Sequence, residues 1–282
     1  MNAERFSVNR MAMNRPDHSL VRQPWRQPAR AKSAESREKR PSISVVIPAF
    51  NEARYIAGTL ESVFKASDLY SGPVEVIVVD NNSTDATSEI ARTMGANVIS
   101  ERKNQIARAR NSGAKVASGD HLVFLDADTT IEGDIFEKVD SNLSSGRAIG
   151  GGAWAEPDVG WFGRSVYKYA INYTLALKNL TVGPFLYCEP RFFRKVGGFD
   201  EELYAAEEFS LANRLKAEGR KIQKKWKIIK YHKQHRVVTS GRKFAKFGGL
   251  EMAVQNAHLI WKPNQKLRQK SQCSFWYNVR ST

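Results

Sequence analysis

A short apolar run from His121 to Leu125 is followed at once by two aspartates, Asp126 and Asp128, one residue apart. Gly119-Asp120 bounds the run in front, and its continuous apolar character predicts a buried strand of a mostly parallel sheet. Ligands of open α/β sheets collect at the carboxyl ends of the strands. We therefore expect both carboxylates to project into a ligand crevice.

The spacing of these two acids predicts a site for a divalent cation. Neighbouring carboxylates repel each other unless a cation joins them, and oxygen-only ligands favour Mg²⁺ or Mn²⁺ shared with substrate phosphates. An acidic turn after a strand is the simpler alternative. A calcium-binding loop is disfavoured because Ile131 stands where such a loop requires glycine.

The first part of the chain alternates strand and helix patterns. Apolar runs predict strands at 43–47, 74–79 and 97–100, and helical spacing predicts a helix after each of the first two strands and another from about 105 to 117. This alternation with short links is typical of an α/β, Rossmann-like sheet with flanking helices. No Gly-x-Gly-x-x-Gly motif and no P-loop pattern follows these strands, so the sequence lacks these two nucleotide-binding motifs.

Length and composition limit the class of protein. A chain of 282 residues with 41% apolar content can bury one good core and a small appendage. No apolar run reaches the roughly 18 residues of a membrane-spanning helix, and the N-terminus lacks the apolar run of a signal peptide. Two cysteines fit a reducing compartment. These features predict a cytoplasmic protein.

The net charge of +15 is concentrated in two segments. Residues 1–41 are polar and rich in arginine without apolar periodicity, which predicts a flexible basic tail. Residues 214–246 carry many lysines and arginines against a single acid, Glu218. Nucleic acid or an anionic membrane could neutralise such a segment. No base-reading or stacking motif accompanies it, so we expect a membrane surface or a phosphate site and no nucleic acid.

Four motifs in register resemble the family 2 glycosyltransferases of the GT-A fold. They are Pro48-Ala-Phe-Asn51-Glu52, Val79-Asp80-Asn-Asn-Ser83-Thr-Asp85, Ala109-Arg110-Asn111-x-Gly113 and Asp126-Ala-Asp128. The resemblance covers roughly residues 43–245. It implies a GT-A domain at 42–250, with a nucleotide-binding half at about 42–130 and an acceptor half at about 131–250. A helical or irregular extension would follow at 251–282.

The resemblance implies a nucleoside-diphosphate sugar lying across the strand ends. Ala49, Asn51 and Glu52 would then line the ribose and the base, and Asp80 would accept a hydrogen bond from the base. Arg110 would lie near the nucleotide or its phosphates. Asn81 stands where many relatives carry a second aspartate.

The same resemblance assigns the cation and the phosphates. Asp126 and Asp128 match the acidic metal motif for Mn²⁺ or Mg²⁺, with Asp128 the more direct ligand, and His235 is a further candidate ligand. The ion would offset charge on the leaving nucleoside diphosphate. Arg242 lies in a segment similar to a Thr-Ser-x-Arg-Arg element, and a guanidinium is well suited to clamp a pyrophosphate.

A Gly197-Gly-Phe-Asp200 turn precedes the pair Glu207-Glu208. Relatives usually carry Glu-Asp at the pair, and the second acid is the general base. Glu208 would therefore take the proton from an acceptor hydroxyl. A processive Gln-x-x-Arg-Trp motif is absent, which favours transfer of a single sugar, and the resemblance implies inversion at the anomeric carbon.

The acceptor half is rich in glycine and aromatic residues. Gly150-Gly-Gly predicts a strand that a backbone or a ligand approaches closely. The acceptor could be a hydroxyl of a saccharide, a lipid or a small molecule. Two other functions remain open: a nucleotidyltransferase, which normally has a glycine-rich loop where Pro48–Glu52 stand, and a non-catalytic basic module that binds membrane or nucleic acid.

Overall fold

The computed structural model describes residues 40–160, 183–230, 232, 235–242 and 268. The predicted basic tail lies outside the described residues except for its last two positions. The described residues also exclude the predicted extension at 251–282 apart from Arg268. They exclude five aromatic residues of the acceptor half as well, namely Trp161, Phe162, Tyr167, Tyr169 and Tyr173.

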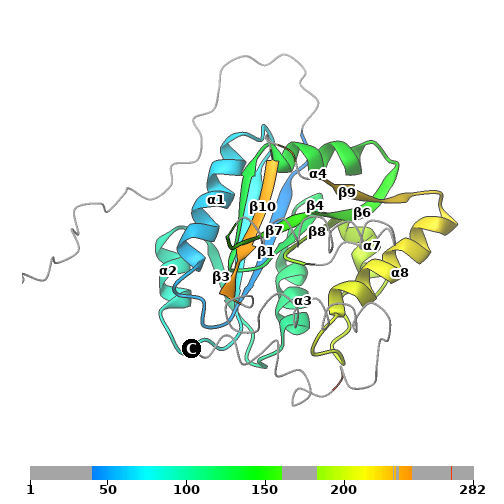
Figure 1. Ribbon diagram of the computed structural model, residues 1–282. Coiled ribbons are helices and arrows are strands. Elements are labelled where there is room, and N and C mark those ends of the chain that lie inside the picture. Colours follow the sequence, from blue (N-terminus) through cyan, green and yellow to red (C-terminus); the bar gives the residue numbers. More distant parts are fainter. Residues whose placement is uncertain (1–39, 161–182, 231, 233–234, 243–267, 269–282) are drawn as a thin grey trace, which may run out of the picture. The chain divides into compact units, whose positions relative to one another are not determined.

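A seven-stranded sheet in the order β3-β2-β1-β4-β8-β6-β9 forms the centre of the fold (Figure 1). The strands β3, β2, β1 and β4 run parallel, whereas β8 is antiparallel to both β4 and β6, and β9 is parallel to β6. This confirms the predicted mostly parallel α/β sheet, with the antiparallel strand β8 as an addition. The strands are β1 (Ile43–Ala49), β2 (Val74–Asp80), β3 (Asn97–Ser100), β4 (His121–Leu125), β6 (Ala148–Ala153), β8 (Phe185–Cys188) and β9 (Lys225–Ile229).

Helices cover both faces of this sheet because successive side chains of a strand point to opposite faces. Along β1, Val45 and Ile47 pack with the helices α1 (Ile56–Asp68), α2 (Thr87–Thr93) and α4 (Ile135–Ser144). Val46 belongs instead to the core cluster that also holds side chains of α3 (Ile106–Val116), α7 (Pro190–Lys195) and α8 (Glu207–Lys221). The predicted strand and helix boundaries between 43 and 125 agree with the structure to within a few residues.

The glycines of β6 allow the backbone to pack closely, as predicted. A Cβ added to Gly151 would lie 1.8 Å from the carbonyl oxygen of Lys227, and one added to Gly150 would lie 2.7 Å from that of Tyr187. The close neighbours are therefore strands β9 and β8.

A second, three-stranded sheet was not predicted. It has the order β5-β10-β7, from β5 (Thr129–Gly133), β10 (His235–Ser240) and β7 (Ala155–Asp158). The strand β10 runs antiparallel to β5 with Thr239 opposite Thr129. This pairing brings the end of β10 next to the loop that follows β4, where the N–H of Ser240 donates to the carbonyl of Asp128 at 3.0 Å.

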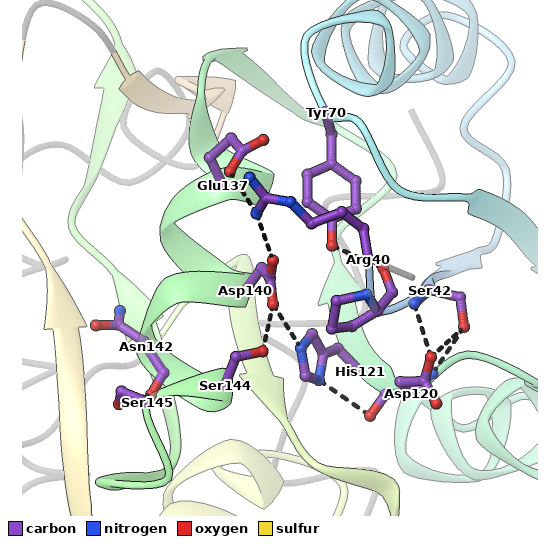
Figure 2. A network of polar contacts seen from close by, with 11 residues as sticks. Arg40, Ser42, Tyr70, Asp120, His121, Glu137, Asp140, Asn142, Ser144 and Ser145 are labelled. Atoms are coloured by element: carbon purple, nitrogen blue, oxygen red, sulfur yellow. Dashed lines mark hydrogen bonds and ion pairs between the residues drawn. The ribbon is translucent and has the colours of Figure 1, made fainter. Parts of the chain in front are cut away.

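A polar network fixes the chain at the amino ends of β1 and β4 (Figure 2). Arg40 donates to Glu137 at 3.2 Å and to the buried carboxylate of Asp140 at 3.0 Å. His121 contacts the same carboxylate at 3.2 Å, and Ser144 donates to it at 2.5 Å. This network lies at the opposite end of these strands from the two predicted metal ligands.

No helix among the described residues combines the length and the apolar character needed to cross a membrane.

Candidate functional site

The carboxyl ends of β1, β2 and β4 meet at one edge of the sheet. Ala49 and Asp80 are direct partners in the parallel pairing of β1 with β2, and β4 pairs with the other side of β1. Asp80 is the last residue of β2, and the loops that follow β1 and β4 carry Asn51 and Asp126. The structure thus gathers most of the predicted donor residues at the edge where open α/β sheets bind ligands.

The loop after β1 is locked to the loop after β2. Asn51 has a left-handed backbone (φ 52°), and its side-chain oxygen accepts the N–H of Thr84 at 2.8 Å. The N–H of Asn51 donates to Ser83 at 3.1 Å, and that of Glu52 donates to the hydroxyl of Thr87 at 2.8 Å. These bonds hold together the two segments that carry the predicted nucleotide site.

Asp80 and Asn81 have different tasks at the end of β2. The Oδ1 of Asp80 accepts the N–H of Ser83 at 3.0 Å, which shapes the turn. The buried amide of Asn81 donates to the carbonyls of Glu101 (3.0 Å) and Lys103 (2.7 Å). Asn81 therefore anchors the segment that leads into α3, a structural use of the position where many relatives carry aspartate.

Arg110 of α3 is buried and is the centre of an acidic cluster. Its guanidinium lies 2.7 Å from Asp126, 2.6 Å from Glu207 and 3.2 Å from Glu208. Burial disfavours the charged guanidinium, but the negative charges of Glu208, Asp126 and Glu207 outweigh it and raise the pKa of Arg110. Arg110 was expected near the nucleotide; among the described residues its charged partners are these three carboxylates, and its guanidinium carbon also lies 5.1 Å from the ring centroid of Phe199.

The two glutamates at the start of α8 differ in burial. The side chain of Glu207 is 3% exposed, whereas that of Glu208 is 17% exposed. Burial and then the charge of Glu208 raise the pKa of Glu207, against the attraction of Arg110, which lowers it. Ala206, just before the helix, has a left-handed backbone (φ 62°). Of the two acids, Glu208 is the more accessible to a substrate.

Arg242 is the centre of a second cluster, formed with Glu52 and Asp128. It binds Glu52 with both terminal nitrogens, at 2.8 and 2.6 Å, and its Nη2 lies 2.9 Å from Oδ2 of Asp128. The hydroxyl of Ser240 donates to the same Oδ2 at 2.5 Å. Arg242 thus makes a bidentate contact with a carboxylate of the chain, and its contact with a pyrophosphate stays a prediction.

The carboxylate oxygens of Asp126 and Asp128 are suitable ligands for a hard divalent cation. Mg²⁺ is usually held by one or two carboxylates together with waters and substrate phosphates, so the pair is sufficient when a diphosphate completes the set. Within the described ranges no group of three or more His, Cys, Asp and Glu side chains could hold a metal ion.

His235 does not join the two aspartates. It lies at the start of β10 opposite Gly133, and its ring nitrogens contact Asp134 at 3.0 Å and the carbonyl of Lys230 at 3.2 Å. Ser240, five positions further along β10, contacts Asp128 together with Arg242, and sequence reasoning passed it over. Only the pairing of β10 with β5 reveals it.

The family model for "Glycosyl transferase family 2" matches residues 44–200, more than half of the chain. Among curated proteins, the glycosyltransferase AglE of Haloferax volcanii is 37% identical over 111 residues, 37% of this chain and 36% of that protein. The amylovoran biosynthesis glycosyltransferase AmsB of Erwinia amylovora is 40% identical over 111 residues, 36% and 35% of the two chains. The chain thus spans about a third of the length of these relatives.

Solved structures extend the similarity of fold beyond this stretch. The mannosyltransferase PcManGT of Pyrobaculum calidifontis, in complex with GDP-Man and Mn²⁺, has a TM-score of 0.56 at 16% identity, covering 87% of this chain and 76% of that one. TarS of S. aureus with UDP-GlcNAc has a TM-score of 0.55 at 18% identity, covering 84% and 79%. These structures confirm the GT-A fold, and with the family model they lead to one conclusion: the chain belongs to glycosyl transferase family 2.

Proposed function

We propose that the protein transfers a single sugar from a nucleoside-diphosphate sugar to an acceptor hydroxyl, with a divalent cation and with Glu208 as general base. The observation that supports this most is the shared guanidinium of Arg110, which lies 2.7 Å from Asp126 and 3.2 Å from Glu208. Asp126, proposed for the diphosphate side, and Glu208, proposed for the acceptor side, therefore lie on either side of the Arg110 guanidinium. Donor and acceptor would meet between them.

The donor nucleotide is assigned to the walls formed by Ala49, Asn51, Glu52 and Asp80. Asp80 uses Oδ1 to shape its own turn, so we assign Oδ2 to an N–H of the base. The two structural neighbours are complexes with GDP-Man and with UDP-GlcNAc, so guanine and uracil nucleotides are the first to test.

Asp128 and Asp126 are the residues that would hold Mn²⁺ or Mg²⁺. When bound, the ion supplies positive charge for the leaving diphosphate. Arg242 lies 2.9 Å from Asp128 and is assigned to the phosphates, because a guanidinium donates to phosphate oxygens in the same forked manner that it shows with Glu52.

Glu208 is assigned to the proton of the acceptor hydroxyl. As the acceptor oxygen forms its bond to the anomeric carbon, Glu208 takes the proton, and the bond from that carbon to the diphosphate oxygen breaks. Attack on the face opposite the diphosphate inverts the configuration of the sugar.

Contact with an anionic membrane stays a prediction. Lys225, Lys227 and Lys230 are exposed along and just after the edge strand β9. Sedimentation with vesicles of phosphatidylglycerol and phosphatidylcholine checks it: binding that salt removes supports the prediction, and equal binding to neutral vesicles contradicts it.

Release of UDP or GDP from a panel of nucleotide sugars, with Mn²⁺ and without an added acceptor, tests the activity. We expect hydrolysis of at least one donor by the wild type, and its loss in Asp128→Asn. A nucleotidyltransferase would instead release pyrophosphate from a nucleoside triphosphate and a sugar phosphate. Pyrophosphate release without donor hydrolysis would replace the proposal with that function, and salt-sensitive nucleic-acid binding without either reaction would favour the binding module.

A further inference from the structure

We infer that Arg242 is a positioning residue that occupies the cation side of Asp128 until the donor binds, so that divalent cation and nucleoside diphosphate bind together. This inference rests on the proposed function, because it concerns the order in which ligands of the same site assemble. It assigns to Arg242 a task before catalysis, beyond its contact with phosphates.

The geometry places the guanidinium of Arg242 between two carboxylates. Its Nη2 contacts both Oε1 of Glu52 at 2.6 Å and Oδ2 of Asp128 at 2.9 Å, while Nη1 contacts Oε2 of Glu52 at 2.8 Å. The ring of Tyr55 lies 5.1 Å from the guanidinium carbon, within the range of a cation–π contact. The side chains of Arg242 and Asp128 are 15% and 13% exposed. The pair is thus largely shielded from water.

This arrangement opposes binding of a cation alone. Oδ2 of Asp128 already accepts two donors, the hydroxyl of Ser240 and Nη2 of Arg242. A divalent ion at this oxygen would have to displace the guanidinium, and it would then face a positive charge close by in a shielded site, where like charges repel strongly. Asp128 should therefore bind Mn²⁺ weakly while Arg242 remains on it.

A diphosphate removes this opposition without a large movement. The contact between Nη1 and Glu52 can keep the guanidinium at the rim of the site while Nη2 exchanges Asp128 for a phosphate oxygen, a partner of the same charge sign. Nε of Arg242 is buried and has no hydrogen-bond acceptor within the described part of the chain, so the contact with the two acids leaves one donor unused. The exchange frees Asp128 for the cation at the moment the phosphates arrive to complete its ligands.

Titration of Mn²⁺ followed by the EPR signal of the free ion tests the inference without measuring turnover. In the absence of nucleotide, we expect Arg242→Gln to bind Mn²⁺ more tightly than the wild type, by roughly tenfold, within the usual range of coupling between two sites. Addition of UDP or GDP should tighten Mn²⁺ binding to the wild type by a similar factor and should have a smaller effect on Arg242→Gln, in which only the phosphate ligands contribute. Arg242→Lys, which keeps the charge but not the fork, should fall between them.

Arg236→Gln is the matched control. Arg236 lies on β10, the strand that ends two residues before Arg242, and pairs with Glu156 and Glu132, so its removal should leave both Mn²⁺ affinities unchanged. Melting curves of each variant verify that the fold is intact. Mn²⁺ binding by Arg242→Gln that is no tighter than that of the wild type without nucleotide would overturn the inference.

The proposed function can fail separately. If nucleotide sugars are turned over and Asp128→Asn abolishes Mn²⁺ binding, but Arg242→Gln does not tighten it, the function stands and the inference is wrong. If the wild type binds no Mn²⁺ with or without diphosphate, the inference is overturned together with the metal-assisted reaction.

Discussion

Arg110 and Asp126 form an ion pair of 2.7 Å that joins the acid after β4 to the two glutamates that begin α8. The guanidinium is buried, and its partners come from segments that are 16 and 97 residues away in the sequence. One side chain thus sets the relative position of the proposed metal acid and the proposed base.

Removal of Arg110 should be strongly destabilising. Arg110→Met leaves three carboxylates around a buried apolar side chain, and loss of one partner of a buried ion pair typically lowers the free energy of unfolding by about 3–5 kcal/mol. Urea denaturation followed by circular dichroism measures it. Arg108→Met, two residues earlier on α3, removes the more exposed ion pair with Glu201 and should cost about 1 kcal/mol or less. Equal losses in the two variants would contradict this view of Arg110.

Replacement of the two glutamates at the start of α8 should have different effects, on catalysis for Glu208 and on stability for Glu207. Glu208→Gln should lower kcat for sugar transfer on the order of 10²–10⁴-fold, the usual contribution of a general base, with little change in donor affinity. Steady-state kinetics and donor binding measure the two effects.

Glu207→Gln is the comparison for Glu208→Gln. Glu207 is the more buried of the pair and lies 2.6 Å from Arg110, so its replacement should act chiefly on stability. If Glu207→Gln lost kcat as severely as Glu208→Gln while remaining equally stable, Glu208 would not be the base.

Much of this site could be predicted because its residues follow strands in short local motifs. Asn51, Asp80 and Asp126 each come directly after an apolar run, so their shared edge follows from parallel pairing. The partners of Arg110 and Arg242 could not be predicted, since they depend on packing between segments far apart in the sequence. The sequence led us to expect His235 beside the two aspartates. Its actual position depends on the register of β10 against β5, which cannot be derived from the sequence.

The network of Figure 2 should make stability depend on pH. Burial opposes ionisation of Asp140, but hydrogen bonds from Ser144, His121 and Arg40 outweigh it and lower the pKa of this carboxyl. A lowered pKa stabilises the fold above the unfolded value of about 3.9, and this contribution is lost as the pH falls through the folded pKa. Asp140→Asn should therefore cost about 1–3 kcal/mol at pH 7, and this cost should shrink below about pH 4.

Glu137→Gln is the control for that measurement. Glu137 is more exposed than Asp140 and contacts only Arg40 in the network drawn, so its replacement should cost less than about 1 kcal/mol. Unfolding by urea at a series of pH values gives both curves. A cost for Asp140→Asn that does not change between pH 3 and pH 7 would contradict the assignment.

Gly151 should tolerate no side chain. A Cβ there would lie 1.8 Å from the carbonyl oxygen of Lys227, so Gly151→Ala must separate β6 from β9 and should lower the melting temperature markedly. Gly58 of α1 is the opposite case, because a Cβ there meets nothing within 4 Å. Gly58→Ala should raise stability by roughly 0.5–1 kcal/mol through helix propensity. Thermal denaturation measures both effects. Equal changes of the melting temperature in Gly151→Ala and Gly58→Ala would contradict this prediction.

The central claim is that the carboxyl edge of the sheet binds a nucleoside diphosphate together with a divalent cation on Asp128. The most direct measurement is the melting temperature of the wild type and of Asp128→Ala with UDP or GDP, each with and without Mn²⁺, since a ligand that binds only the folded state raises it. We predict that one diphosphate stabilises the wild type only when Mn²⁺ is present, and that Asp128→Ala abolishes the effect. No shift with either diphosphate under any condition, or an equal shift in Asp128→Ala, would contradict the claim.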